Sequence, residues 1–124
     1  LFAGLVVARN GTWQDDLVLW TDTMTKAPRN ATAHLYLGHA LLVRGQTDRA
    51  LDRALVELET AVALKPGRAD SLVNLGVALA LTDRHEAAIF AYREALRVRP
   101  HEAAAHADLA ISLSTLGLHR RGRR

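Results

Sequence analysis

The sequence predicts an all-α protein built from antiparallel pairs of helices. Alanine and leucine together supply 43 of the 124 residues, while isoleucine and aromatic residues are scarce, and this composition favours helix over sheet. The prolines Pro28, Pro66 and Pro100 divide the chain into two intervals of nearly equal length, the first being four residues longer than the second. A repeat of this length predicts stacked supersecondary units that share one core, with about seven helices in total.

Each proline ends a pattern of helical period, because proline lacks an amide hydrogen and crowds the preceding turn. The unit from residue 69 to 100 shows this most clearly. Two apolar stripes with helical spacing run through it, and they consist of Leu72, Leu75 and Leu79, followed by Ala88, Tyr92, Ala95 and Leu96. Gly76 lies where a side chain would hold the two helices apart. Asp83 is expected to cap the second helix.

These residues have the spacing of a tetratricopeptide repeat (TPR), and the chain resembles that family in four units. The matching residues are Gly4, Val7, Gly11, Trp20 and Pro28 in the first unit, with Asp16 where alanine is usual; Leu37, Gly38, Leu41, Gly45, Ala50 and Pro66 in the second; Leu72, Leu75, Gly76, Leu79, Ala88, Tyr92, Ala95 and Pro100 in the third; and Leu109, Ala110, Leu113 and Gly117 in the fourth. The resemblance implies a right-handed TPR solenoid over residues 1–118. Its repeats would cover about 1–30, 31–68 and 69–102, with a half repeat at 103–118 and a basic tail at 119–124.

The longer second unit has a visible cause in the sequence. The segment Asp48-Arg49-Ala50-Leu51 is followed at once by Asp52-Arg53-Ala54-Leu55, and removing either copy makes the interval from Pro28 to Pro66 equal to that from Pro66 to Pro100. Four residues lengthen a helix by about 6 Å and turn it by about 400°, so its face is displaced by only about 40°. We expect either a helix of about five turns or a local bulge. The insertion would either change the solenoid twist or be tolerated on the convex side.

The resemblance implies that the first helix of each pair lines a concave binding face. The repeat phase places there Tyr36, His39 and Val43 from the second unit, Asn74, Val77 and Leu81 from the third, and Asp108, Ile111 and Thr115 from the fourth. An apolar surface with few polar anchors favours a peptide or a partner helix as its ligand. For Tyr36 and His39, ordinary packing against the neighbouring helix is an equal alternative.

Two binding modes of TPR proteins are not expected. An asparagine ladder is not supported, because Asn74 is the only asparagine among the three equivalent places. A clamp for two carboxylates needs several basic residues on this face, but the two lysines, Lys26 and Lys65, lie near helix ends. The function that the sequence favours is therefore that of a non-catalytic scaffold for an apolar or helical protein partner.

Catalysis, metal binding and a cofactor are not expected. The chain holds no cysteine, which excludes disulfides, thiolate zinc sites and thiol nucleophiles. His34 and His39 are five residues apart, as are His101 and His106, whereas a zinc pair on one helix face needs a spacing of three or four. Glu102 could meet His106, but that pair alone makes no metal site. Neither a Gly-x-Ser-x-Gly elbow nor a phosphate-binding loop occurs.

The N-terminal part carries a second, narrower resemblance. Its residues are Arg9, Asn10, Trp13, Asp15, Asp16, Leu19, Trp20, Ala27, Pro28, Asn30 and Ala31. This string resembles the junction between the last membrane helix and the TPR region in multi-pass, glycosyltransferase-like membrane proteins. The alternative function is thus an extramembrane accessory domain, although no apolar run here reaches the roughly 18 residues of a membrane span. Otherwise Trp13 and Trp20, two turns apart, would pack in an ordinary first repeat.

The charge distribution argues against a nucleic-acid partner. The net charge is +3, but without the four arginines of residues 120–124 the body has 12 basic and 13 acidic residues. A tail without aromatic residues offers no platform for base stacking. The last helix, expected from Ala103 to about Leu116, has no second helix after it, so exposure of Ile111 and Leu118 there, and of residues 1–5 at the other end, leaves a homodimer open. The compartment also stays open, with the cytoplasm or the extracytoplasmic side of a membrane-anchored parent as the alternatives.

Overall fold

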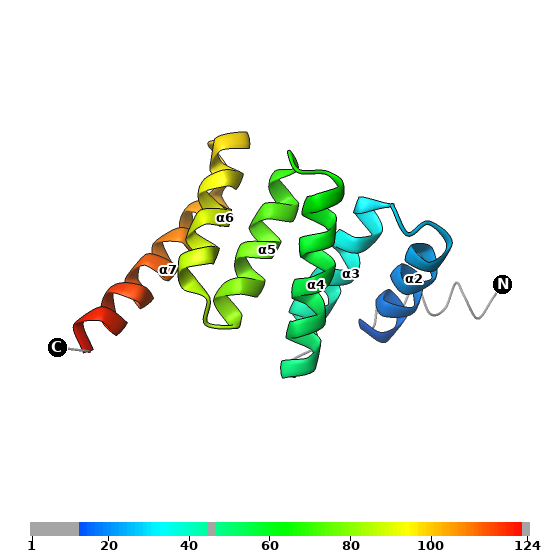
Figure 1. Ribbon diagram of the computed structural model, residues 1–124, viewed down its shortest axis with the longest axis horizontal. Helices are drawn as coiled ribbons and strands as arrows, with labels where there is room; N and C mark the ends of the chain where they lie inside the picture. The colour runs from blue at the N-terminus through cyan, green and yellow to red at the C-terminus, as the bar shows by residue number, and fades with distance from the viewer. Residues whose placement is uncertain (1–12, 45–46, 123–124) are drawn as a thin grey trace. The chain divides into compact units, whose positions relative to one another are not determined.

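The structure, a computed structural model, describes residues 13–44 and 47–122. These residues form six helices and no strand (Figure 1). The helices are α2 (Trp13–Lys26), α3 (Ala31–Arg44), α4 (Asp48–Leu64), α5 (Ala69–Leu81), α6 (His85–Val98) and α7 (Ala103–Gly122). The all-α prediction is confirmed, whereas any helix before Trp13 falls outside the described residues. None of the described helices has the length and apolar character needed to cross a membrane.

The chain divides into two compact units, which are described separately. Unit 1 covers Leu1–Leu64 and contains α2, α3 and α4, while unit 2 covers Lys65–Arg124 and contains α5, α6 and α7. In unit 1, α3 lies against both α2 and α4, and in unit 2, α6 lies against both α5 and α7. Consecutive helices within each unit run side by side in opposite directions (Figure 1).

A glycine on the first helix of each pair allows the close approach that the sequence predicts. A Cβ added at Gly76 of α5 would fall on the ring of Tyr92 of α6. A Cβ added at Gly38 of α3 would lie 2.5 Å from Cγ of Leu58 of α4. Tyr92 and Leu58 are both fully buried, and burial of a large apolar side chain contributes about 1.5–3 kcal/mol. The absence of a side chain on each glycine is therefore what brings these helix pairs into contact.

The duplicated segment forms an added turn at the start of α4. This helix is continuous over 17 residues, compared with 14 in α6, so a helix of about five turns is confirmed. Ala54, Leu58 and Ala61 of α4 are fully buried, as are Ala88, Tyr92 and Ala95, which hold the equivalent places of the next repeat on α6. The second copy thus keeps the register of the repeat. The prediction that Ala50 occupies the alanine place is wrong, because Ala54 does and Ala50 is only half-buried.

The turn between α5 and α6 differs from the prediction. Asp83 does not cap α6, because its backbone adopts a left-handed conformation with φ of 63°. The Asp83 amide donates to Ala80 O at 3.0 Å and the Arg84 amide to Leu79 O at 2.8 Å, which is the hydrogen-bond pattern of a Schellman motif at a helix C-terminus. Arg84 takes the N-cap place of α6 without a side-chain hydrogen bond. Asp83 occupies the repeat place of Gly45 and Gly117 in the sequence.

Helix α7 is longer than predicted. It continues to Gly122 instead of ending near Leu116, so it runs into the segment expected to be a basic tail. Ala105 and Ser112 are its buried residues, with Leu109 and Leu116 half-buried beside them, whereas Ile111, Leu113 and Leu118 are exposed. The exposure predicted for Ile111 and Leu118 is therefore confirmed.

Candidate functional site

In unit 1, the predicted site residues form an exposed stripe along α3. Tyr36, His39 and Val43 are three and four residues apart and all three are exposed, as expected for one face of a helix. The Tyr36 ring stacks on Trp20 of α2, with centroids 4.9 Å apart and an angle of 24° between the planes. Tyr36 still exposes 41% of its surface, so it packs on the neighbouring helix and faces solvent at once.

In unit 2, the predicted site residues lie on two helices that contact each other, α5 and α7. Leu81 of α5 and Ile111 of α7 are 54% and 62% exposed, while Asn74 and Val77 are half-buried. The Asn74 side-chain amide donates to Asp70 O, one turn earlier, at 3.0 Å. Thr115, the remaining member of the α7 stripe, donates its hydroxyl to Ile111 O at 2.9 Å. The result is an aliphatic surface with one amide and one carboxylate.

The carboxylate is that of Asp108 on α7. Asp108 is half-buried, and burial raises the pKa of its carboxyl group above the ordinary value. Within the described part of the chain, its carboxylate takes part in no hydrogen bond or ion pair. Burial, and secondarily the Asp108 charge, raises the pKa of the Tyr92 hydroxyl, so Tyr92 stays protonated at neutral pH. Asp108 of α7 therefore lies near Tyr92 of α6, whose ring packs against Gly76 of α5.

His34 proves to be part of a buried polar cluster. Its Nδ1 lies 2.7 Å from Glu57 Oε1 of α4, and its Nε2 lies 2.8 Å from Pro28 O in the turn before α3. The two ring nitrogens therefore contact a side chain of α4 and a backbone carbonyl of the preceding turn at hydrogen-bonding distance. His34 thus ties α3 to α4 and to the turn before α3.

His106 is the equivalent histidine in the fourth repeat, and it makes one of the two contacts that His34 makes. Its Nε2 lies 2.8 Å from Pro100 O. Glu102, which the sequence suggested could meet His106, instead pairs with Arg99 at 3.3 Å. Among the residues that the structure describes, no three His, Asp or Glu side chains gather closely enough to hold a metal ion.

Sequence reasoning missed a second set of exposed apolar residues. Val18, Val56 and Phe90 lie on α2, α4 and α6 and are between 60% and 70% exposed. They occupy the same place in successive repeats. The repeat alignment could have found them, but only the first helices were considered as binding surfaces. Any test of the first helices therefore needs these residues as controls.

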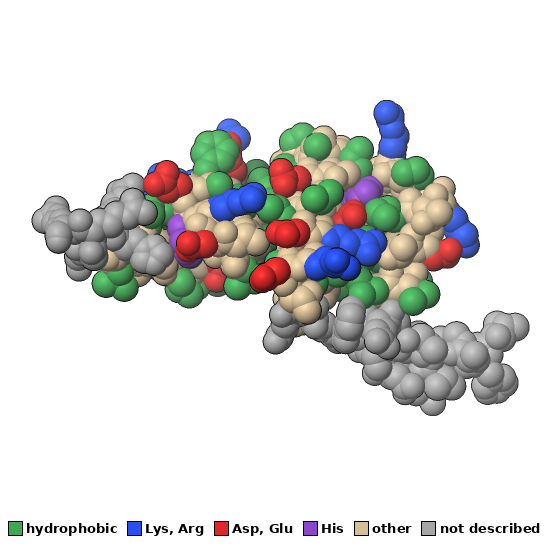
Figure 2. Space-filling view, turned by 60° about the horizontal axis from the view of Figure 1, so that its bottom comes forward, with side chains coloured by type: hydrophobic (Ala, Val, Ile, Leu, Met, Phe, Trp, Pro, Cys, Tyr) green, Lys and Arg blue, Asp and Glu red, His purple; other side chains and the backbone are tan. Residues whose placement is uncertain are grey.

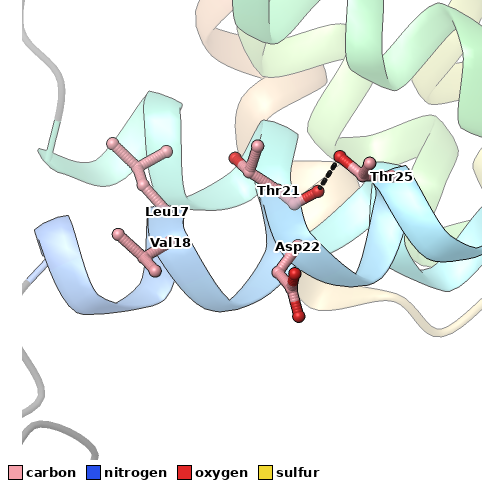
Figure 3. Close-up of a pocket in the computed structure, with 5 residues that line it drawn as sticks. All are labelled: Leu17, Val18, Thr21, Asp22 and Thr25. Carbon is pink, nitrogen blue, oxygen red and sulfur yellow. Dashed lines mark hydrogen bonds between the residues drawn. The ribbon is translucent and has the colours of Figure 1, made fainter.

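A hollow of about 410 Å³ lies along α2 and contains no obvious reactive group (Figure 3). Its described lining consists of Leu17, Val18, Thr21, Asp22 and Thr25. The Thr25 hydroxyl donates to Thr21 O at 2.8 Å, and Asp22 pairs with Lys26 at 3.0 Å. The polar side chains of Thr25 and Asp22 are thus engaged within α2 itself. Figure 2 likewise shows acidic and basic side chains interspersed with hydrophobic ones on the face it presents, without a large patch of one charge.

No protein-family model matches the sequence, and a search of curated proteins returns no match. Solved structures do match. A mutant O-GlcNAc transferase of Thermobaculum terrenum is similar over 89% of this chain, with 29% identity and a TM-score of 0.77, and the chain spans only 20% of that enzyme.

Two smaller proteins match over most of their length. The TPR domain of OM64 from Arabidopsis shares 17% identity, with a TM-score of 0.76 and coverage of 88% of this chain and 87% of that domain. The first TPR of Spaghetti (RPAP3), bound to the HSP90 peptide SRMEEVD, shares 19% identity, with a TM-score of 0.81 and coverage of 93% and 88%. The similarity to these TPR domains confirms the TPR fold that the repeat motifs predict.

Proposed function

We propose that the chain is a non-catalytic interaction module whose exposed helix faces, α3 in unit 1 and α5 with α7 in unit 2, each bind an extended peptide or a partner helix. The observation that carries the proposal is the outward display of large apolar side chains at repeated places on the first helices, namely Tyr36, Val43, Leu81 and Ile111. Isolated apolar residues are normal on protein surfaces, but stripes of them with few charges suit a docking face.

The similar TPR of Spaghetti supports this proposal, because that protein is bound to a peptide. The stack of Tyr36 on Trp20 adds a physical argument. An aromatic ring held in place by a neighbour loses little conformational freedom when a ligand packs on it. Tyr36 is therefore the residue of unit 1 that we expect to contribute most to affinity.

The proposal is tested with four single variants of the whole chain and a bound partner obtained by pull-down. Tyr36→Ala and Asn74→Ala should each weaken binding by about tenfold, since truncation of a well-placed contact costs on the order of 1–2 kcal/mol. Val56→Ala and Phe90→Ala are the controls, because these residues are also exposed and apolar but lie on second helices. If only the control variants lose affinity, the second helices bind the partner and the proposal is wrong.

The second candidate function is an accessory domain of a membrane-embedded, glycosyltransferase-like protein. The similarity to the O-GlcNAc transferase of Thermobaculum terrenum supports the association with a glycosyltransferase, and the N-terminal string of residues supports the position next to a membrane helix. Reading the coding sequence upstream of Leu1 tests it. Several apolar spans ending near Leu1 would support it, and a start codon or further soluble repeats would contradict it.

A third alternative, nucleic-acid binding through the arginines of residues 120–124, would show binding that weakens steeply with salt. If the chain binds a peptide as proposed, removal of residues 120–124 should leave peptide binding unchanged. Loss of partner binding after their removal would contradict the proposed peptide-binding function.

A further inference from the structure

The charge of the face on α5 and α7 suggests which peptides it accepts. Between Ala69 and Leu81 the only charged residue of α5 is Asp70, and between Ala103 and Leu118 the only one of α7 besides histidine is Asp108. Asp70 already accepts a hydrogen bond from Arg68 Nε at 2.8 Å. The arginines that follow Leu118 on α7 begin twelve residues after Asp108, about 18 Å along the helix axis. The exposed stripes of α5 and α7 therefore supply no cation to Asp108.

The surroundings of Asp108 make an external cation favourable. The carboxylate is half-buried near Tyr92 of α6 and has no hydrogen bond or ion pair among the described residues. Burial has already removed part of its hydration, as the raised pKa of the group indicates. A cation on a bound ligand would pair with the Asp108 carboxylate. Because burial has already removed part of the hydration of this carboxylate, less desolvation free energy is lost when the pair forms.

We infer that the peptide bound by this face carries a lysine or arginine that pairs with Asp108, beside aliphatic side chains that pack on Val77, Leu81 and Ile111. The inference rests on the function proposed above and names the chemistry of its ligand. The peptide SRMEEVD, bound by the similar TPR of Spaghetti, carries three acidic residues against one arginine, so its net negative charge should make it a weaker ligand for this face than a basic peptide.

The test selects ligands without presupposing them. A displayed library of random peptides is enriched on the immobilised chain, and the selected sequences are compared with those enriched on the Asp108→Asn variant. The expected result is enrichment of Lys or Arg next to aliphatic residues on the wild type, and its loss on Asp108→Asn. A selected peptide and its Lys→Gln counterpart are then titrated by fluorescence anisotropy, with SRMEEVD as the acidic probe.

The wild type should bind the Lys peptide about tenfold more tightly than the Gln peptide, which corresponds to about 1.4 kcal/mol. Asp108→Asn should bind both equally, whereas Asp108→Lys should prefer a peptide with Glu in place of Lys. Asp52→Asn is the control of equal charge change, because Asp52 is exposed on α4 of the other unit. Circular dichroism confirms that each variant remains folded.

The outcomes separate the two proposals. Enrichment of uncharged or acidic peptides, or a preference for Lys that survives Asp108→Asn, overturns the inference and leaves peptide binding intact. Failure of the library to enrich any peptide contradicts peptide binding itself, and the inference falls with it.

Discussion

Replacing Gly76 by alanine should destabilise unit 2, whereas the same replacement at Gly117 should stabilise it. Both glycines lie inside helices, where alanine is favoured over glycine by about 1 kcal/mol. At Gly117 nothing lies within 4 Å of the added Cβ, so most of that gain should appear. At Gly76 the Cβ falls on the buried Tyr92 ring. Overpacking of this kind costs about 1–3 kcal/mol, and the larger values should apply because neither a helix backbone nor an aromatic ring can yield easily.

The net expectation is a loss of about 1–2 kcal/mol for Gly76→Ala and a gain of about 0.5–1 kcal/mol for Gly117→Ala. For a unit of this size, 1 kcal/mol shifts the midpoint of thermal unfolding by about 4–8 °C. Far-ultraviolet circular dichroism during urea and thermal unfolding measures both variants. Tyr92→Val should relieve the clash, so that Gly76→Ala costs less in that background and the double-mutant cycle gives a coupling on the order of 1 kcal/mol. Shifts of equal sign for Gly76→Ala and Gly117→Ala would refute the reasoning.

Three further predictions concern Asp83, Asp108 and the His34–Glu57 pair. Asp83→Gly should stabilise the chain by up to about 1 kcal/mol in urea unfolding, because glycine adopts positive φ without strain; a loss of stability would show that the contact of Asp83 with His85 at 3.3 Å outweighs the strain. Asp108→Asn should stabilise the chain at neutral pH by less than about 1 kcal/mol. The raised pKa of Asp108 means that its ionised form is disfavoured in the folded state, so the gain should fade as pH falls through the raised pKa towards 3.8; a gain that persists in acid would contradict this cause. Glu57→Gln should lower the midpoint of thermal unfolding less than His34→Leu does. The glutamine amide can still donate to the His34 ring, whereas His34→Leu leaves a buried carboxylate without its partner. Equal decreases in the midpoint would rule out this account of the pair.

The packing of the helix pairs could be predicted from the sequence because it depends only on the repeat period. Gly76 and Tyr92 take their places from the spacing of the apolar residues, and a helix of fixed pitch converts that spacing into a face. The same reasoning places Gly38 opposite the second helix of its repeat. The six described helices agree with the expected architecture, since every repeat has the same period.

The errors arise where one sequence signal allows two structures. Aspartate is favoured both as an N-cap and among the few residues that tolerate positive φ, so Asp83 could be placed only by its backbone conformation. The two copies of Asp-Arg-Ala-Leu are identical, and only the packing of Ala54 with Leu37 and Leu41 shows which copy keeps the register. The contact between His34 and Glu57 joins residues 23 positions apart, and it depends on how α3 and α4 rotate against each other.

The repeat separates the residues that hold the fold from those that can select a ligand. The places that pack one helix on the next keep their character from unit to unit, as the small residues Gly38 and Gly76 show. The places that face outward do not, because Tyr36, Asn74 and Asp108 are equivalent in the repeat and differ in chemistry. Within unit 2, a ligand that follows this surface meets the amide of Asn74 on α5 and the carboxylate of Asp108 on α7, so a ligand of uniform repeating sequence would match only one of them. We therefore expect unit 2 to recognise a specific, non-repetitive segment, and substitution of Asn74 or Asp108 should change which peptides are selected, not only how tightly they bind.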